Sequence, residues 1–142
     1  MLYLDTSVLV PLFVPEPDSS AVRQWFETKI GETLAISSWT LTEFASAMGI
    51  KVRDKGLKAD QARRACRLMD QLAADSFEVF IPTRNDYGKA VEHLGHHALG
   101  LRAGDALHLA VAQNEGAKCL YTLDRRLIVA GRKLAVKTAS PI

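Results

Sequence analysis

The chain has 142 residues, of which 48% are hydrophobic and 24% are charged, and its formal net charge is +2. This composition excludes an intrinsically disordered chain. The length is typical of one domain over residues 1–142. The mildly basic net charge permits an anionic partner. No stretch approaches the roughly 18 apolar residues of a membrane span, and Asp5 interrupts the apolar start before a signal peptide can form, so we expect a cytoplasmic protein without a membrane anchor.

The first seven residues, MLYLDTS, place an apolar run directly before an acid and two hydroxyls. Such a run predicts a buried strand that carries Asp5 to its carboxyl end. Open α/β sheets bind their ligands at the carboxyl ends of the strands. We therefore expect a functional site to begin at Asp5.

The stretch that follows predicts mostly helices. In chain order, the patterns indicate a helix over 8–13, a helix from 18 to 31, a strand over 34–38, and helices over 40–55 and 58–74. The spacing of Thr40 and Glu43 is typical of a capping box that opens the fourth of these elements. The last two helices should form a hairpin with a basic outer surface, made of Lys51, Arg53, Lys55, Lys58, Arg63, Arg64 and Arg67.

The second half of the chain alternates strands with helices. The patterns predict strands over 77–81, 118–124 and 134–136, and helices over 83–99, 103–115 and 125–130. The middle helix is apolar nearly all round and should be buried. The strand that ends at Asp124 repeats the order of apolar run, hydroxyl and acid seen at Asp5. This alternation predicts an α/β fold with a parallel sheet and helices on both faces.

Four carboxylates stand where solubility does not require them: Asp5, Glu43, Asp105 and Asp124. Asp5 and Asp124 have an alternative interpretation as N-caps of the helices that follow them, and Glu43 has one in the capping box. Asp105 lacks such a simple alternative because the helix that carries it has no wide polar face. A buried, unpaired carboxylate is costly, so Asp105 requires a cation or Arg102 as its partner.

If the four acids converge, a multivalent cation is needed to offset their mutual repulsion. Ligand sets made only of oxygen atoms suit Mg²⁺ or Mn²⁺. Such a metal supports phosphodiester hydrolysis by activating water and binding a phosphate oxygen, so no side-chain nucleophile is required. The residues themselves therefore suggest a metal-dependent phosphoryl-transfer enzyme.

Three segments resemble the PIN-domain ribonucleases. They are the strand that ends in Asp5-Thr6-Ser7, the block LRAGDALHLA around Asp105, and the block YTLDRRL around Asp124; a glutamate in the first turn of a helix, Glu43, completes the pattern. The match extends over essentially the whole chain. More narrowly, the chain is similar to the VapC toxins of toxin-antitoxin pairs.

This resemblance implies a three-layer α/β/α sandwich around a mainly parallel sheet and Mg²⁺- or Mn²⁺-dependent endonucleolytic cleavage of RNA. It implies inhibition by a small cognate antitoxin, and it suggests a homodimer. It places the catalytic metal site on Asp5, Glu43, Asp105 and Asp124, with Thr6 and Thr122 in supporting positions. The chain departs from the family at Ala103-Gly104, where bulkier residues are common, and this departure is expected to loosen the start of the helix.

Other functions remain as alternatives. A haloacid-dehalogenase-type phosphatase needs a second acid where this chain has Ser7, and a dinucleotide-binding module needs a glycine-rich turn that is absent after the first strand. A PIN scaffold without catalysis, which only binds RNA or protein, is a further alternative, and a metal-dependent cleavage assay decides it.

The remaining polar and aromatic features favour structural roles. His93, His96 and His97 have helical spacing but no fourth ligand, so we predict a solvated histidine face and not a zinc site. His108 is predicted to be a core histidine that is hydrogen-bonded to the backbone. The basic hairpin either contacts RNA phosphates or is simply solvated. The two tryptophans, Trp25 and Trp39, are expected to pack in the core or in a dimer interface.

Overall fold

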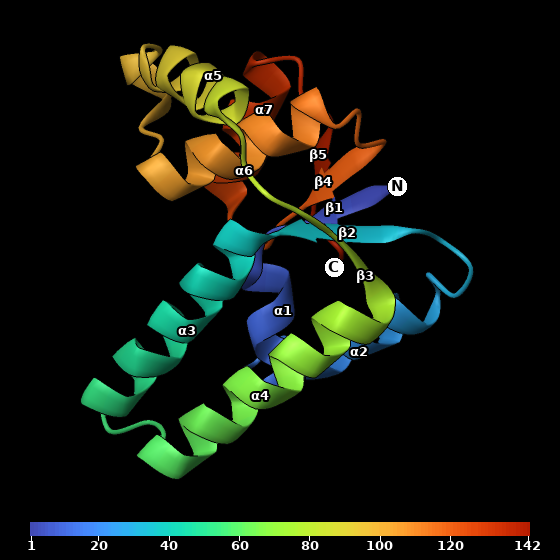
Figure 1. Cartoon of the computed structure of the whole chain (residues 1–142), viewed down its shortest axis with the longest axis vertical. Coiled ribbons are helices and arrows are strands. Elements are labelled where there is room, and N and C mark those ends of the chain that lie inside the picture. The colour runs from blue at the N-terminus through green and yellow to red at the C-terminus, as the bar shows by residue number, and fades with distance from the viewer.

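A single sheet forms the centre of the computed structural model, which describes residues 1–142 (Figure 1). Its five strands are β1 (Leu2–Leu4), β2 (Leu34–Ser37), β3 (Phe77–Phe80), β4 (Cys119–Tyr121) and β5 (Thr138–Ala139). They lie in the order β3-β2-β1-β4-β5, and every neighbouring pair is parallel. The predicted parallel sheet is confirmed, and β1, which precedes Asp5, is its central strand.

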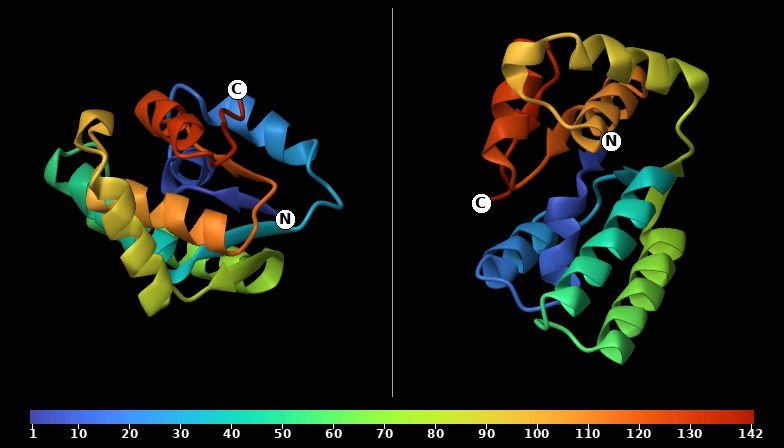
Figure 2. Two further views of the ribbon diagram at one scale, coloured as in Figure 1. Left: turned by 90° about the horizontal axis from the view of Figure 1, so that it is seen from above. Right: turned by 90° about the vertical axis from the view of Figure 1, so that its left-hand side faces the viewer.

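Helices cover both faces of this sheet (Figures 1 and 2). They are α1 (Thr6–Phe13), α2 (Ser19–Glu27), α3 (Ser38–Arg53), α4 (Ala59–Ser76), α5 (Arg84–Leu94), α6 (Ala103–Asn114) and α7 (Arg125–Lys133), with a short 3₁₀ turn at His97–Leu99. Helices α1 to α4 lie on one side and α5 to α7 on the other, which confirms the three-layer α/β/α sandwich. None of these helices has both the length and the apolar content that crossing a bilayer requires.

The pleat of the strands divides the core into two clusters. Tyr3 and Ala35 pack with α6, whereas their neighbours Leu4 and Ile36 pack with α3 and α4 on the other face. This alternation follows from the two-residue period of a strand. Residues 106–112 of α6 are all buried, so the helix predicted from its nearly continuous apolar pattern is confirmed as a core element.

The start of α3 differs from the prediction. The helix begins directly after β2, with Ser37 as its N-cap, and the backbone N–H of Ser37 donates to Thr40 Oγ1 at 3.2 Å. Thr40 therefore closes the capping motif instead of opening it, and the predicted capping box between Thr40 and Glu43 is wrong. Glu43 lies in the second turn, not the first, and no helix-capping hydrogen bond occupies its carboxylate. Glu43 therefore does not serve as a helix-capping residue.

Three boundaries in the second half of the chain also differ. The helix predicted to reach Leu99 ends at Leu94, because the chain turns at Gly95 into the 3₁₀ segment. The helix predicted to end at Ala130 continues through Gly131 to Lys133, and the last strand is at Thr138–Ala139 instead of residues 134–136. Gly131 was expected to lie after the helix, but it lies inside α7, where the helix approaches β5.

We expect Gly131→Ala to lower the free energy of unfolding by about 1–3 kcal/mol, although alanine is the better helix former. A Cβ at this buried position would overlap the side chain of Thr138 on β5. Gly88, inside α5, offers a matched control because nothing lies within 4 Å of the Cβ it would gain. Gly88→Ala should raise the free energy of unfolding by roughly 0.5–1 kcal/mol. Urea denaturation of both variants measures the difference, and a Gly131→Ala protein as stable as the wild type would contradict the close-packing explanation.

Helices α3 and α4 form the predicted hairpin, which extends away from the sheet (Figure 1). Of its basic residues only Lys51 is partly buried, and its ammonium pairs with Glu16. The others are exposed: Arg53, Lys55, Lys58, Arg63, Arg64 and Arg67. Exposed basic side chains are expected both for a surface that contacts RNA phosphates and for one that is simply solvated. Contact between this hairpin and RNA therefore stays a prediction.

Candidate metal centre

The four acids singled out in the sequence line one cavity of about 320 Å³ at the carboxyl edge of the sheet. Asp5 follows β1, Glu43 projects from α3, Asp105 lies in the first turn of α6, and Asp124 follows β4. The other residues of the lining are Thr6, Ser7, Val10, Ser46, Ala47 and Ile50. The fold therefore brings together all four carboxylates from separate parts of the chain.

A larger cleft of about 830 Å³ lies between the start of α5 and the end of α6, and no hydrophobic residue lines it. Its one buried acid, Asp86, accepts hydrogen bonds from the Thr83 backbone at 2.6 Å, the Thr83 hydroxyl at 2.7 Å and the Asn114 amide at 2.7 Å. These bonds cap α5 and tie it to α6. The carboxylate is fully occupied by structural contacts, so the chemistry is better sought at the smaller acidic cavity.

Asp5 is held by two hydroxyls. Its carboxylate Oδ2 accepts hydrogen bonds from Ser7 Oγ at 2.6 Å and from Thr122 Oγ1 at 2.7 Å, and the residue is only 6% exposed. The side chain makes no capping bond to the first turn of α1, so the N-cap interpretation of this carboxylate is wrong. Thr122 was expected beside an acid, but the contribution of Ser7 was not predicted. These bonds orient Asp5 toward the cavity.

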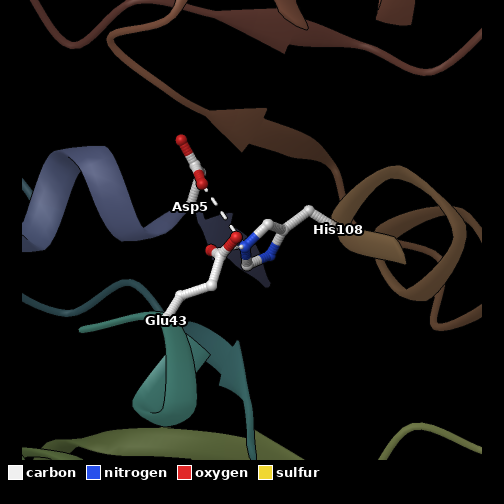
Figure 3. A group of neighbouring side chains, drawn as sticks. All are labelled: Asp5, Glu43 and His108. Atoms are coloured by element: carbon white, nitrogen blue, oxygen red, sulfur yellow. Dashed lines mark hydrogen bonds and ion pairs between the residues drawn. The ribbon is translucent and has the colours of Figure 1, made fainter. Parts of the chain in front are cut away.

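Glu43 is held by Thr6 from α1 and by His108 from α6, of which Figure 3 draws the His108 contact. Its Oε2 accepts hydrogen bonds from Thr6 Oγ1 at 2.6 Å and from His108 Nε2 at 2.7 Å. Burial by itself would raise the pKa of the Glu43 carboxyl, but the hydrogen bond and charge of His108, together with the Thr6 bond, hold that pKa below its usual value. Glu43 is therefore ionised at neutral pH and is fixed in position.

The sequence also did not reveal the part that His108 plays in the site. The ring is 1% exposed, as expected for a core histidine, but its partners are side chains and not the backbone. Its Nε2 lies 3.4 Å from Asp5 Oδ1, and the ligand atoms of Asp5, Glu43 and His108 all lie within 4.8 Å of one another (Figure 3). Complete burial would lower the pKa of His108, but Tyr3, Glu43 and Asp5 raise it to about 10. The resulting imidazolium offsets part of the negative charge.

Asp105 is half-buried and has no ion-pair partner. Its Oδ2 accepts a hydrogen bond from the backbone N–H of Arg102 at 3.1 Å, so the predicted pairing with Arg102 involves the backbone instead of the guanidinium. Burial raises the pKa of this carboxyl, the Arg102 bond opposes the rise only in part, and the charges of Asp5, Asp124 and Glu43 add to it. A proton or a cation beside Asp105 is therefore favoured.

Asp124 combines both roles considered for it. Its Oδ1 caps α7 by accepting a hydrogen bond from the Arg126 backbone N–H at 2.7 Å, while the same side chain lines the acidic cavity. Its own backbone N–H donates to Thr122 Oγ1 at 3.0 Å. The hydroxyl of Thr122 thus joins Asp124 to Asp5 across β4 and β1. Capping and a place in the site coexist at this residue.

The remaining predicted features are structural. His93 is buried against α6, so a fully solvated histidine face is wrong, whereas His96 and His97 are exposed. The group of three potential metal-binding side chains that the fold brings together is Asp5, Glu43 and His108, and it does not include these three histidines. Trp25 packs against Phe26 and Tyr121, and Trp39 packs at the edge of the α6 cluster; the prediction of core packing is confirmed for both.

The family model described as "PIN domain" matches residues 2–133. The chain belongs to the PIN-domain family. Ribonuclease VapC46 of Mycobacterium tuberculosis is 33% identical over 145 residues, and the alignment covers 99% of this chain and 97% of that protein. Ribonuclease VapC47 of the same species is 29% identical over 143 residues, with the same coverage of 99% and 97%. Within the PIN-domain family the chain is thus VapC-type, and the resemblance seen in the sequence is confirmed.

Solved structures show the same fold. The crystal structure of Mycobacterium tuberculosis VapC20 matches with a TM-score of 0.75 at 19% identity, covering 92% of this chain and 95% of that one. VapBC2 from Rickettsia felis, bound to a DNA fragment from its promoter, matches with a TM-score of 0.71 at 23% identity, covering 99% and 98%. At these identities the similarity establishes the architecture, which is the PIN-like α/β fold.

Proposed function

We propose that this protein is a metal-dependent endoribonuclease that hydrolyses RNA phosphodiester bonds and serves as the toxin of a VapBC-type toxin-antitoxin pair. The observation that carries the proposal is the convergence of Asp5, Glu43, Asp105 and Asp124 on one cavity in a chain of the VapC-type PIN family. Its relatives at 29% and 33% identity are named ribonucleases. VapC20, a structural neighbour, is described as a toxin that cleaves the sarcin-ricin loop.

The donor set fits a divalent metal. All four side chains offer carboxylate oxygens, His108 contacts one of them, Glu43, and burial together with the neighbouring carboxylates raises the pKa of Asp105. We propose Mg²⁺ or Mn²⁺, with Asp5, Glu43, Asp105 and Asp124 as the residues that hold it. Such an ion supplies Lewis acidity and lowers the pKa of bound water.

Hydrogen bonds within the protein hold the side chains of this site in place. Ser7 and Thr122 orient Asp5, Thr6 and His108 orient Glu43, and the Arg102 backbone orients Asp105. The Ser7 hydroxyl donates to Asp5 and accepts from the Leu123 backbone at 2.9 Å, so it is engaged in structure and is no free nucleophile. This supports hydrolysis by water, without a covalent intermediate on the protein.

The partners follow from the same family. Neighbours in structure include a toxin-antitoxin complex from Klebsiella pneumoniae and VapBC-1 from nontypeable Haemophilus influenzae. We propose that residues 1–142 act as one nuclease domain, that RNA is the substrate, and that a small cognate antitoxin inhibits it. A homodimer and a cytoplasmic location stay predictions. The alternative of a scaffold without catalysis is disfavoured because all four acids are present and face one cavity.

The decisive experiment is to induce the protein without its antitoxin and map new RNA 5′ ends across the transcriptome. We expect growth arrest with one or a few dominant cleavage sites, and we expect EDTA to abolish cleavage of the same RNA by the purified protein. Normal growth with unchanged RNA 5′ ends, from a protein that is expressed and folded, would overturn the nuclease proposal in favour of the scaffold.

A further inference from the structure

A buried chain of polar side chains runs behind the acidic cavity. Tyr3 Oη donates to Ser37 Oγ at 2.9 Å, His108 Nδ1 lies 3.1 Å from Tyr3 Oη, and His108 Nε2 lies 2.7 Å from Glu43 Oε2. Tyr3 and Ser37 are completely buried, and His108 is 1% exposed. The chain therefore connects β2, β1 and α6, and it reaches the cavity at Glu43, with Asp5 Oδ1 farther from the same nitrogen at 3.4 Å.

The core does not require polar atoms at this place. His108 lies within the stretch 106–112 of α6, where every other residue is apolar and buried. Buried polar groups without partners cost free energy, so a leucine here would satisfy the packing without the need for partners. The hydrogen bonds of His108 and Tyr3 thus serve a purpose other than filling the core, and the hydrogen bond that His108 makes at the cavity is to the Glu43 carboxylate.

A second feature of α6 acts on the same carboxylate. A Cβ at Gly104 would overlap Glu43 Oε1 and come within 3.2 Å of Trp39 Nε1. Gly104 and His108 are four residues apart, so they lie on the same face of the helix. One helix face therefore supplies both the space for one oxygen of Glu43 and the donor for the other. The departure from the family at Gly104 makes room for Glu43, whereas the expected loosening of the helix start stays a prediction.

We propose that His108 is a positioning residue for the metal site. Together with the space at Gly104, it holds the Glu43 carboxylate toward Asp5, without itself touching metal or substrate. A glutamate side chain has several rotatable bonds, and a single hydrogen bond from Thr6 to Oε2 leaves the carboxylate free to turn about that oxygen; His108 adds a second bond to the same oxygen. The inference rests on the proposed function, since it assigns to Glu43 the role of a metal ligand.

The test is calorimetric titration of the purified full-length protein with Mn²⁺ in the absence of RNA. His108→Leu should weaken Mn²⁺ binding by about 10–100-fold, the usual cost of removing a group that orients a ligand. His108→Gln should lose less, because its amide places a donor near the position of Nε2. His93→Leu is the matched control, since this histidine is also buried but lies on α5, outside the acidic group. Its Mn²⁺ affinity should equal that of the wild type.

Two further measurements separate positioning from general damage. In a Glu43→Gln background, His108→Leu should cost little additional affinity, whereas in an Asp124→Asn background its full effect should remain. Gly104→Ala should also weaken Mn²⁺ binding while keeping α6 intact, because alanine is favoured in helices. This variant decides the matter if His108→Leu does not fold.

Unchanged Mn²⁺ affinity in the folded His108→Leu and Gly104→Ala proteins would overturn the inference and leave the proposed function standing. A wild-type protein that binds no Mn²⁺ and cleaves RNA with no divalent cation would instead overturn the proposed function itself.

Discussion

Asp5→Asn is expected to abolish RNA cleavage while the fold survives. The substitution keeps the shape of the side chain and an oxygen that accepts from Ser7 or Thr122, but it removes the charge at the centre of the acidic group. Because substitutions of groups that only orient a ligand already cost roughly 10–100-fold, loss of a ligand's charge should cost more. The fold is insensitive because the Asp5 carboxylate does not cap α1. Cleavage of RNA in Mg²⁺ and far-UV circular dichroism measure the two effects.

The same variant should lose metal-induced stabilisation. A ligand that binds only the folded state stabilises it by about 2.7 kcal/mol at 100 times its Kd, so Mn²⁺ should raise the melting temperature of the wild type. Asp5→Asn should show little or none of this rise. Asp75→Asn, at an exposed acid on α4, is the control and should behave like the wild type in both assays. Full nuclease activity of Asp5→Asn in added Mg²⁺ would refute the assignment of Asp5 to the metal.

Asp105→Asn is expected to stabilise the metal-free protein and to abolish cleavage as well. In the folded state the pKa of Asp105 is raised above 3.8 by burial and by the neighbouring carboxylates, so the folded protein binds a proton at this residue more tightly than the unfolded chain does. That contribution to stability is present below about pH 3.8 and is lost as the pH rises through the folded-state pKa. At neutral pH the ionised carboxylate is therefore unfavourable. Asparagine removes the charge and still accepts from the Arg102 N–H.

Thermal unfolding in EDTA tests this second prediction. At pH 7 the Asp105→Asn protein should melt at a higher temperature than the wild type, and the difference should shrink as the pH falls toward 4. Saturating Mn²⁺ should reverse the order, because the wild type gains binding free energy that the variant cannot match. A variant that melts below the wild type in EDTA at pH 7 would show that the Asp105 charge is compensated within the fold. Such a trade between stability and activity is common at catalytic sites.

Several features of this protein were predictable because they depend on local pattern. The apolar runs before Asp5 and Asp124 identify β1 and β4, the continuous apolar face identifies α6 as buried, and the alternation of elements identifies the parallel sheet. Parallel strands present their carboxyl ends at one edge, so acids that follow two such strands must lie near one another. Asp5, Asp124 and the α/β fold with a parallel sheet were accessible in this way, whereas the PIN-like sandwich was implied by the resemblance to the family.

Tertiary structure alone decided the features that depend on distant neighbours. The sequence allowed Glu43 to be a cap, but β2 runs directly into α3 at Ser37, which moves the cap upstream and leaves Glu43 facing the cavity. A lone histidine in an apolar helix is usually a core residue, and nothing local indicates that Tyr3, 105 positions away, and Glu43 lie at its two nitrogens. The space at Gly104 also depends on a distant neighbour, because Glu43 of α3 lies beside it. The acids were thus recognisable from local pattern, whereas the contacts that hold them in place arise only when separate elements pack together.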